Sequence, residues 1–227
     1  ATFIPFAEET GLIHDIGRWV LWEAARTCRD WVEVLSPTPG EFKVTVNLSA
    51  RQLDDAGIVT EVEKVVGEMG VDPAFLVLEI TETAMMNAAP ERLEELRGLG
   101  VPLAIDDFGT GYSSLASLHK LSVDVLKIDQ VFVKGIAEED ASPFVGTMVG
   151  LGQANVLQTI VEGIESKEQL DRLVELGCTT GQGFYFAKPL SQSQAAQLIE
   201  RQAAGSVVFD LAAIAEGYRD RRLRSVP

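Results

Sequence analysis

The sequence predicts an α/β protein of the TIM-like (β/α) barrel class. The first observation is the alternation, along 227 residues, of short β-rich runs with longer segments of helical periodicity. The second is that polar side chains stand at or just after the carboxyl end of nearly every β-rich run. In a barrel of parallel strands these ends converge on one mouth, whereas in an open doubly wound sheet they spread along an edge. Convergence of polar groups favours the barrel.

Six runs have the length and composition of strands, and each is followed by a helical pattern. The expected strands are residues 43–48, 75–80, 102–106, 124–128, 156–161 and 180–186. The expected helices that follow them are residues 59–69, 89–99, 113–118, 143–154, 167–176 and 191–202. Gly70, Gly100 and Gly177 stand just after three of these helices, where a left-handed C-terminal cap is expected, and so support the helix ends.

A barrel of this class has eight strands, two more than the six found here. Before residue 43 the chain offers only a helix-like segment, at residues 11–30. We therefore expect two strands to be missing upstream of Ala1. Either these residues are part of a longer parent protein, or the protein is truncated, and the sequence favours neither alternative. Without the two strands, backbone hydrogen-bonding groups of neighbouring strands would be exposed, so these residues alone should be poorly stable, aggregate, or pair as a homodimer.

The expected organisation is one barrel domain over residues 1–204 and a C-terminal helical extension over residues 205–227. Apolar residues from Val208 to Tyr218 fall at helical spacing, and a basic cluster of Arg219, Arg221, Arg222 and Arg224 follows them. The favoured interpretation is a helix that packs on the domain or on a partner. An electrostatic contact with a membrane or a nucleic acid is the alternative.

Composition excludes several classes of protein. Hydrophobic residues make up 46% of the chain, which rules out general disorder. The 34 acidic and 19 basic residues give a net charge of −15, which argues against DNA binding, and a phosphate ligand would need local positive charge. Cys28 and Cys178 lie far apart and suggest neither a disulfide framework nor a zinc site. This cysteine usage fits a reducing compartment, so we expect a cytoplasmic protein, or the cytoplasmic part of a larger membrane-bound one. No run approaches the ~20 apolar residues needed to span a bilayer.

Four carboxylates, Glu79, Asp106, Asp107 and Glu162, would be brought together at the barrel mouth. Several carboxylates at short distance strongly disfavour being ionised together, so a cation is expected among them. Carboxylate oxygens and the Asn47 amide, with no cysteine or histidine at the strand ends, select Mg²⁺ or Mn²⁺. Neighbouring aspartates suggest two ions, which would supply the positive charge that a phosphate substrate requires.

The string DDFGTGYSS, residues 106–114, is the most unusual stretch of the chain. Adjacent side chains on a strand point in opposite directions, so both aspartates reach one site only if the backbone leaves strand geometry at once. Gly109 and Gly111 are the residues expected to permit that turn.

Several strings together resemble the EAL family of cyclic di-GMP phosphodiesterases, and they occur in the family's order. They are FIPFAEETGLI (3–13), VNLS (46–49), LEITE (78–82), DDFGTGYSSL (106–115), LKID (126–129), VEGIE (161–165) and QGFYFAKP (182–189). The resemblance extends from about Phe3 to about residue 200. It implies a modified barrel that hydrolyses cyclic di-GMP to linear pGpG with two Mg²⁺ or Mn²⁺ ions.

The resemblance also assigns ligands position by position. Asn47, Glu79 and Asp106 would bind one ion. Asp106, Asp107 and Glu162 would bind the other, with Asp106 as the bridge.

Four further residues match family positions around these ligands. Lys127 matches the lysine that contacts the attacking water, either as a proton acceptor or as a hydrogen-bonding group. Glu82 matches the glutamate that anchors the Asp-Asp loop. Glu165 matches a glutamate behind the ligands, and Gln182 a residue at the substrate and water end of the pocket.

One family motif is not found in the sequence. The Glu-x-Leu-x-Arg segment that gives the family its name, with one more ligand and a substrate arginine, is expected upstream of Ala1. If the parent lacks it, the alternative is a catalytically inactive cyclic di-GMP receptor or protein-interaction module. In either case the resemblance implies a link to sensory or diguanylate cyclase domains.

Overall fold

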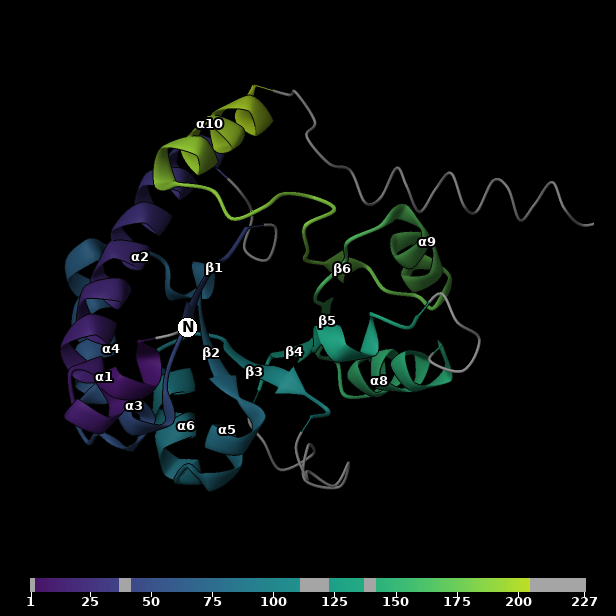
Figure 1. Cartoon of the computed structure of the whole chain (residues 1–227). Helices are drawn as coiled ribbons and strands as arrows, with labels where there is room; N and C mark the ends of the chain where they lie inside the picture. The colour runs from purple at the N-terminus through teal and green to yellow at the C-terminus, as the bar shows by residue number, and fades with distance from the viewer. Residues whose placement is uncertain (1–2, 37–41, 111–122, 137–141, 205–227) are drawn as a thin grey trace, which may run out of the picture. The chain divides into compact units, whose positions relative to one another are not determined.

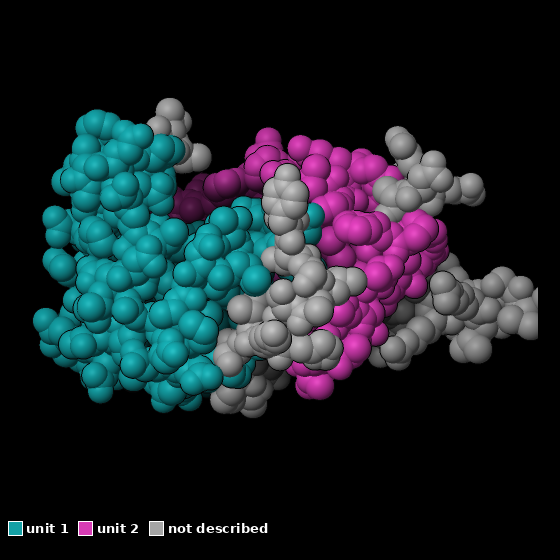
Figure 2. Space-filling view, turned by 90° about the horizontal axis from the view of Figure 1, so that it is seen from below, with its two compact units in different colours: residues 1–126 teal, residues 127–227 magenta. Residues whose placement is uncertain are grey.

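The computed structural model describes residues 3–36, 42–110, 123–136 and 142–204. Two compact units divide the chain, Ala1–Leu126 and Lys127–Pro227 (Figure 2). The elements of both units alternate between strands and helices along the chain (Figure 1).

The first unit begins with two helices and continues with strand–helix repeats. Its elements are α1 (Ile4–Thr10), α2 (Ile13–Leu35), β1 (Val44–Asn47), α3 (Ala50–Asp54), α4 (Ile58–Met69), the 3₁₀ turn η1 (Pro73–Phe75), β2 (Leu76–Thr81), α5 (Glu82–Asn87), α6 (Pro90–Gly98) and β3 (Leu103–Phe108). The division between the units falls inside β4 (Val125–Ile128). The second unit continues with η2 (Gln130–Phe132), α8 (Ser142–Ala154), β5 (Gln158–Val161), α9 (Lys167–Glu175), β6 (Thr180–Gly181) and α10 (Gln192–Ala203).

The strands follow one another in the sheet in chain order, from β1 to β6. The pairs β1–β2, β2–β3 and β5–β6 are parallel. On either side of β4, the Asp124 N–H donates to the Leu103 carbonyl and the Glu162 N–H donates to the Ile128 carbonyl. A doubly wound sheet reverses its strand order at a switch point, and this sheet does not. Chain order is the order of a barrel, as the sequence predicts.

Strand β2 shows why these runs form a central sheet. Its residues from Leu76 to Ile80 are all buried, so both faces are covered. A strand covered on both faces carries a continuous apolar run rather than an alternating one. The exception in the run is Glu79, a buried carboxylate, and it is a predicted site residue.

Five of the six predicted strands begin and end within two residues of the observed ones, and the sixth is much shorter than predicted. Strand β5 starts at Gln158 rather than Val156, because Val156 takes a left-handed conformation with φ 59°. Strand β6 has two residues rather than seven. The chain turns at Gly183, whose carbonyl accepts hydrogen bonds from the N–H groups of Phe186 and Ala187.

The helices agree with prediction wherever they are long. Gly70, Gly100 and Gly177 have φ of 65°, 84° and 88°, so the predicted left-handed positions are confirmed. Three short helices are not predicted from the sequence: α1, α3 and α5, which have seven, five and six residues. The predicted helix at 113–118 and the predicted extension at 205–227 lie outside the described residues. Among the residues that are described, no helix has the length and apolar character needed to cross a membrane.

Three helices begin with the same capping arrangement, a serine followed three residues later by glutamine. The pairs are Ser49 with Gln52, Ser166 with Gln169, and Ser191 with Gln194. In each pair the serine side chain accepts from the glutamine N–H, and the glutamine side chain accepts from the serine N–H. These capping boxes therefore determine the residue at which each of the helices α3, α9 and α10 begins.

Candidate active site

Three predicted ligands in the first unit lie on one face of the sheet at its carboxyl end. Asn47 is level with Glu79 in the β1–β2 pairing, and Asp106 is level with Thr81 in the β2–β3 pairing. Side chains alternate along a strand, so residues that are level, or two positions apart, share a face. The sheet therefore presents an amide and two carboxylates on the same side, with Glu79 buried and Asn47 exposed.

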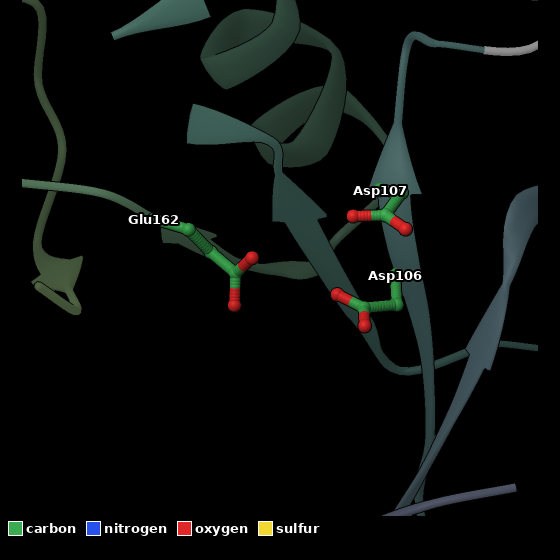
Figure 3. Close-up of side chains that lie close together, drawn as sticks. All are labelled: Asp106, Asp107 and Glu162. Carbon is green, nitrogen blue, oxygen red and sulfur yellow. The ribbon is translucent and has the colours of Figure 1, made fainter. Parts of the chain in front are cut away.

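The second aspartate joins this group through an unusual backbone conformation. Asp107 has φ 55°, in the left-handed region, directly after Asp106 on β3. Figure 3 shows both aspartate carboxylates turned to the same side of β3, and one oxygen of each lies within 4.8 Å of the other. The predicted departure from strand geometry is present, but Asp107 itself makes it, before Gly109 with φ 95°.

Glu82 holds the backbone that follows this pair. It is the first residue of α5, is buried, and accepts a hydrogen bond at Oε2 from the Gly109 N–H at 2.9 Å. Thr81 caps the same helix by accepting from the Ala84 N–H. The capped start of α5 thus fixes the glutamate that contacts the loop after Asp107.

The second unit contains a close ion pair between Lys127 and Glu162. Lys127 lies on β4, and Glu162 directly follows β5, where Figure 3 labels it. Nζ of the lysine is 2.8 Å from Oε1 of the glutamate, and the two side chains are 4% and 18% exposed. A buried ammonium group needs a compensating partner, and this carboxylate is one.

The two remaining predicted residues lie in the loops after β5 and β6. The Glu165 N–H donates to Oε1 of Gln169 at 2.7 Å, and the Glu165 side chain is exposed. The Gln182 N–H donates to the Val161 carbonyl, and the Gln182 carbonyl accepts from the Ile164 N–H. These hydrogen bonds fix the main chain of Glu165 and of Gln182, and so the positions from which the two side chains extend.

Sequence reasoning missed the glutamines at the third position of α3 and of α9. Gln52 and Gln169 follow Asn47 and Glu162 closely in sequence, and each fixes the backbone between a strand end and the next helix. The signal was available, because serine with glutamine three residues later is a capping motif.

Comparison with known proteins identifies the family. The EAL domain family matches residues 1–189. The chain belongs to the EAL domain family. The resemblance drawn from the motifs is confirmed.

Two members of the family show how much of a longer protein this chain matches. The chain is 41% identical over 196 residues to the bifunctional diguanylate cyclase/cyclic di-GMP phosphodiesterase MucR of Pseudomonas aeruginosa, which covers 85% of this chain and 28% of that protein. It is 38% identical over 192 residues to the cyclic di-GMP phosphodiesterase PdeR of Escherichia coli, which covers 83% of this chain and 28% of PdeR. The chain therefore spans about a quarter of the length of these relatives.

Solved EAL structures confirm the fold class. The PaMucR phosphodiesterase in complex with c-di-GMP has a TM-score of 0.78 at 40% identity, covering 86% of this chain and 79% of that one. The EAL domain of Mycobacterium smegmatis DcpA has a TM-score of 0.74 at 35% identity, covering 82% of this chain and 84% of that one. The prediction of a TIM-like barrel of the EAL type is therefore correct as a fold class.

Proposed function

We propose that the protein to which this EAL domain belongs hydrolyses cyclic di-GMP to linear pGpG. The observation that carries the proposal is the row of oxygen donors at the ends of β1, β2 and β3, present in a chain of this family. Relatives at 38–41% identity that are named cyclic di-GMP phosphodiesterases support it. The buried pair of Lys127 and Glu162 adds the polar groups that such chemistry uses.

The chemistry of the donors fits Mg²⁺ or Mn²⁺. The side chains are carboxylates and one amide, which are hard oxygen ligands that suit these ions and not zinc. We propose that Asn47, Glu79 and Asp106 hold one ion. A second ion would be held by Asp106, Asp107 and Glu162. When bound, two such ions supply positive charge to the phosphodiester and lower the pKa of the attacking water.

Lys127 is proposed to orient that water. In its ion pair with Glu162 the lysine is an ammonium group, which offers hydrogen-bond donors and no acceptor. This state favours the hydrogen-bonding role over the proton-accepting one, because the lysine would first have to lose a proton. Glu162 has two carboxylate oxygens, so one can contact Lys127 while the other contacts a cation.

The remaining predicted residues have supporting roles in this proposal. Glu82 holds the loop after Asp107 through the Gly109 N–H. Glu165 supports the loop that follows Glu162, and Gln182 lies at the substrate and water end of the pocket. These roles rest on the family positions and on the backbone contacts described above.

The proposal extends to the complete protein. Since the relatives are about three times as long as this chain, we propose that the parent carries sensory or diguanylate cyclase domains. We also propose that this part acts in the cytoplasm, as a homodimer, and that the parent supplies the Glu-x-Leu-x-Arg segment.

The test is turnover by the complete parent protein, with Mg²⁺ and then with Mn²⁺. We expect pGpG to appear, and we expect loss of turnover in Lys127→Ala but not in Lys64→Ala, an exposed lysine on α4. Cyclic di-GMP that binds but stays intact would instead indicate the receptor. Neither binding nor turnover would contradict both functions.

A further inference from the structure

The side-chain amide of Gln169 connects the two loops that follow β4 and β5. Its Oε1 accepts hydrogen bonds from the N–H groups of Glu165 at 2.7 Å and Ser166 at 3.0 Å. Its Nε2 donates to the Val133 carbonyl at 3.3 Å. One half-buried side chain therefore bonds to the loop after β5 and to the end of the η2 turn after β4.

The buried ion pair lies next to these two loops in the chain. Lys127 lies on β4 two residues before Asp129, whose side chain caps η2 by accepting from the Val131 N–H. Glu162 begins the loop that runs to Ser166, and its N–H donates to the Ile128 carbonyl at 3.0 Å. A shift of either loop would therefore move backbone that lies within two residues of one of the two charged groups.

The loop after Glu162 is packed so closely that it has little freedom to shift alone. A Cβ on Gly163, where φ is 73°, would lie 2.2 Å from the Cβ of Gln130 in η2. A Cβ on Gly183 would lie 2.1 Å from the Ile164 carbonyl oxygen, and the Tyr185 N–H donates to that same oxygen. Gln169 extends this fixation to the outer ends of the two loops.

We propose that Gln169 is a positioning residue for the Lys127–Glu162 ion pair. By tying Val133 to Glu165 and Ser166, it holds the loops at the spacing where Nζ and Oε1 lie 2.8 Å apart. Residues that orient catalytic or ligand side chains from behind change activity or metal affinity about 10- to 100-fold when replaced. The effect on turnover rests on the proposed function, whereas the effect on the loops does not.

Gln169 also serves as the third residue of the capping box of α9, and the two roles use different atoms. The cap uses Oε1 as an acceptor, and the tie to Val133 uses Nε2 as a donor. Gln169→Glu separates them, because glutamate completes the same capping box but has no donor when ionised. Gln194→Glu is the matched control, since it makes the same change in the capping box of α10.

The experiment compares both variants with wild type in the complete parent protein. For Gln169→Glu we expect the kcat for cyclic di-GMP to fall about 10- to 100-fold with KM within about twofold, because Gln169 acts through the ion pair. Mn²⁺ affinity should fall over the same range. In metal-free protein, amides of residues 129–136 and 162–166 should exchange hydrogen faster. Gln194→Glu should match wild type in all four measurements.

Two results would overturn the proposal. In the first, Gln169→Glu matches Gln194→Glu in turnover and in exchange, so the tie has no effect. In the second, both variants lose turnover equally, so the added charge is the cause. If wild type does not hydrolyse cyclic di-GMP, the proposed function fails, and the exchange comparison alone decides the positioning role. If Gln169→Glu does not fold, the same comparison is made between Gln169→Met and Gln194→Met.

Discussion

Removing the carboxylate from the Lys127–Glu162 pair should destabilise the protein strongly. Nζ and Oε1 are 2.8 Å apart, and the side chains are only 4% and 18% exposed. Glu162→Gln keeps the size of the side chain and removes its charge. The Lys127 ammonium group then stays buried beside a neutral amide, where it is poorly solvated.

The size of the effect follows from this geometry. At an effective dielectric constant of about 20, charges 2.8 Å apart attract by about 6 kcal/mol, and desolvation of the two ions offsets much of this. Breaking a buried pair from one side costs about 3–5 kcal/mol. Since Glu162 keeps some contact with solvent, we expect a loss near the lower end, about 3 kcal/mol. The double variant Lys127→Met with Glu162→Gln removes both charges and should be at least about 1 kcal/mol more stable than Glu162→Gln alone.

The assay is urea unfolding in the presence of a chelator, so that bound metal does not contribute. Asp171→Asn is the control, because it breaks an exposed pair with Lys167 on α9 and should cost less than about 1 kcal/mol. The reasoning is wrong if Glu162→Gln costs no more than Asp171→Asn. It is also wrong if the double variant is no more stable than Glu162→Gln.

Three further predictions concern rate, backbone strain and pH. Asp106→Asn in the complete parent should lower turnover at least ~10³-fold, about 4 kcal/mol of barrier, whereas Asn47→Ala should cost less and Lys127→Ala should fall between them. Metal titration alongside turnover checks this prediction. Near-wild-type turnover by Asp106→Asn with two ions bound would contradict the assignment of Asp106 as the bridging ligand. Val156→Gly should raise the free energy of unfolding in urea by about 1 kcal/mol. Val156 has φ 59° and is 93% exposed, so glycine relieves backbone strain and little packing is lost. An unchanged urea midpoint would contradict this. Burial raises the pKa of the Cys28 thiol to about 11, so its contribution to stability is complete below the unfolded pKa near 9 and is lost as pH rises through 11. Wild type should therefore lose about 1 kcal/mol more than Cys28→Ala between pH 8 and pH 10, and equal losses would contradict the shift.

The strands and their polar ends could be predicted because their signals are local. A run such as residues 75–80 is apolar at every position except Glu79, and a carboxylate in an otherwise apolar strand is the signal of a site residue. The carboxyl ends of parallel strands share one edge, so the pattern places Asn47, Glu79 and Asp106 together before any coordinates are known. The observed pairing of β1 with β2 and of β2 with β3 shows in addition that these three residues lie on the same face of the sheet.

Features that depend on distant contacts could not be predicted in the same way. Residues 180–186 have the aromatic content of a strand, but Gly183 packs directly on the backbone of Ile164 and the chain turns there. Glu162, an ion-pair partner of Lys127, is 35 positions away in the sequence, and no local pattern predicts this contact. The helices α1, α3 and α5 are too short to show a helical period, although α3 carries a capping motif.

The position of the strained residue on β3 follows from what two adjacent aspartates must do. If β3 stayed regular through Asp107, its carboxylate would point to the opposite face from that of Asp106, and a turn at Gly109 would come too late to correct it. Only a change at Asp107 itself brings both carboxylates to one side, and its φ of 55° is that change. Left-handed backbone costs a residue with a Cβ roughly 1–2 kcal/mol, and aspartate is among the side chains that tolerate it best. Glycine would remove the cost and also the carboxylate, so the strain falls on the one residue of the loop that cannot be glycine if both carboxylates serve the site.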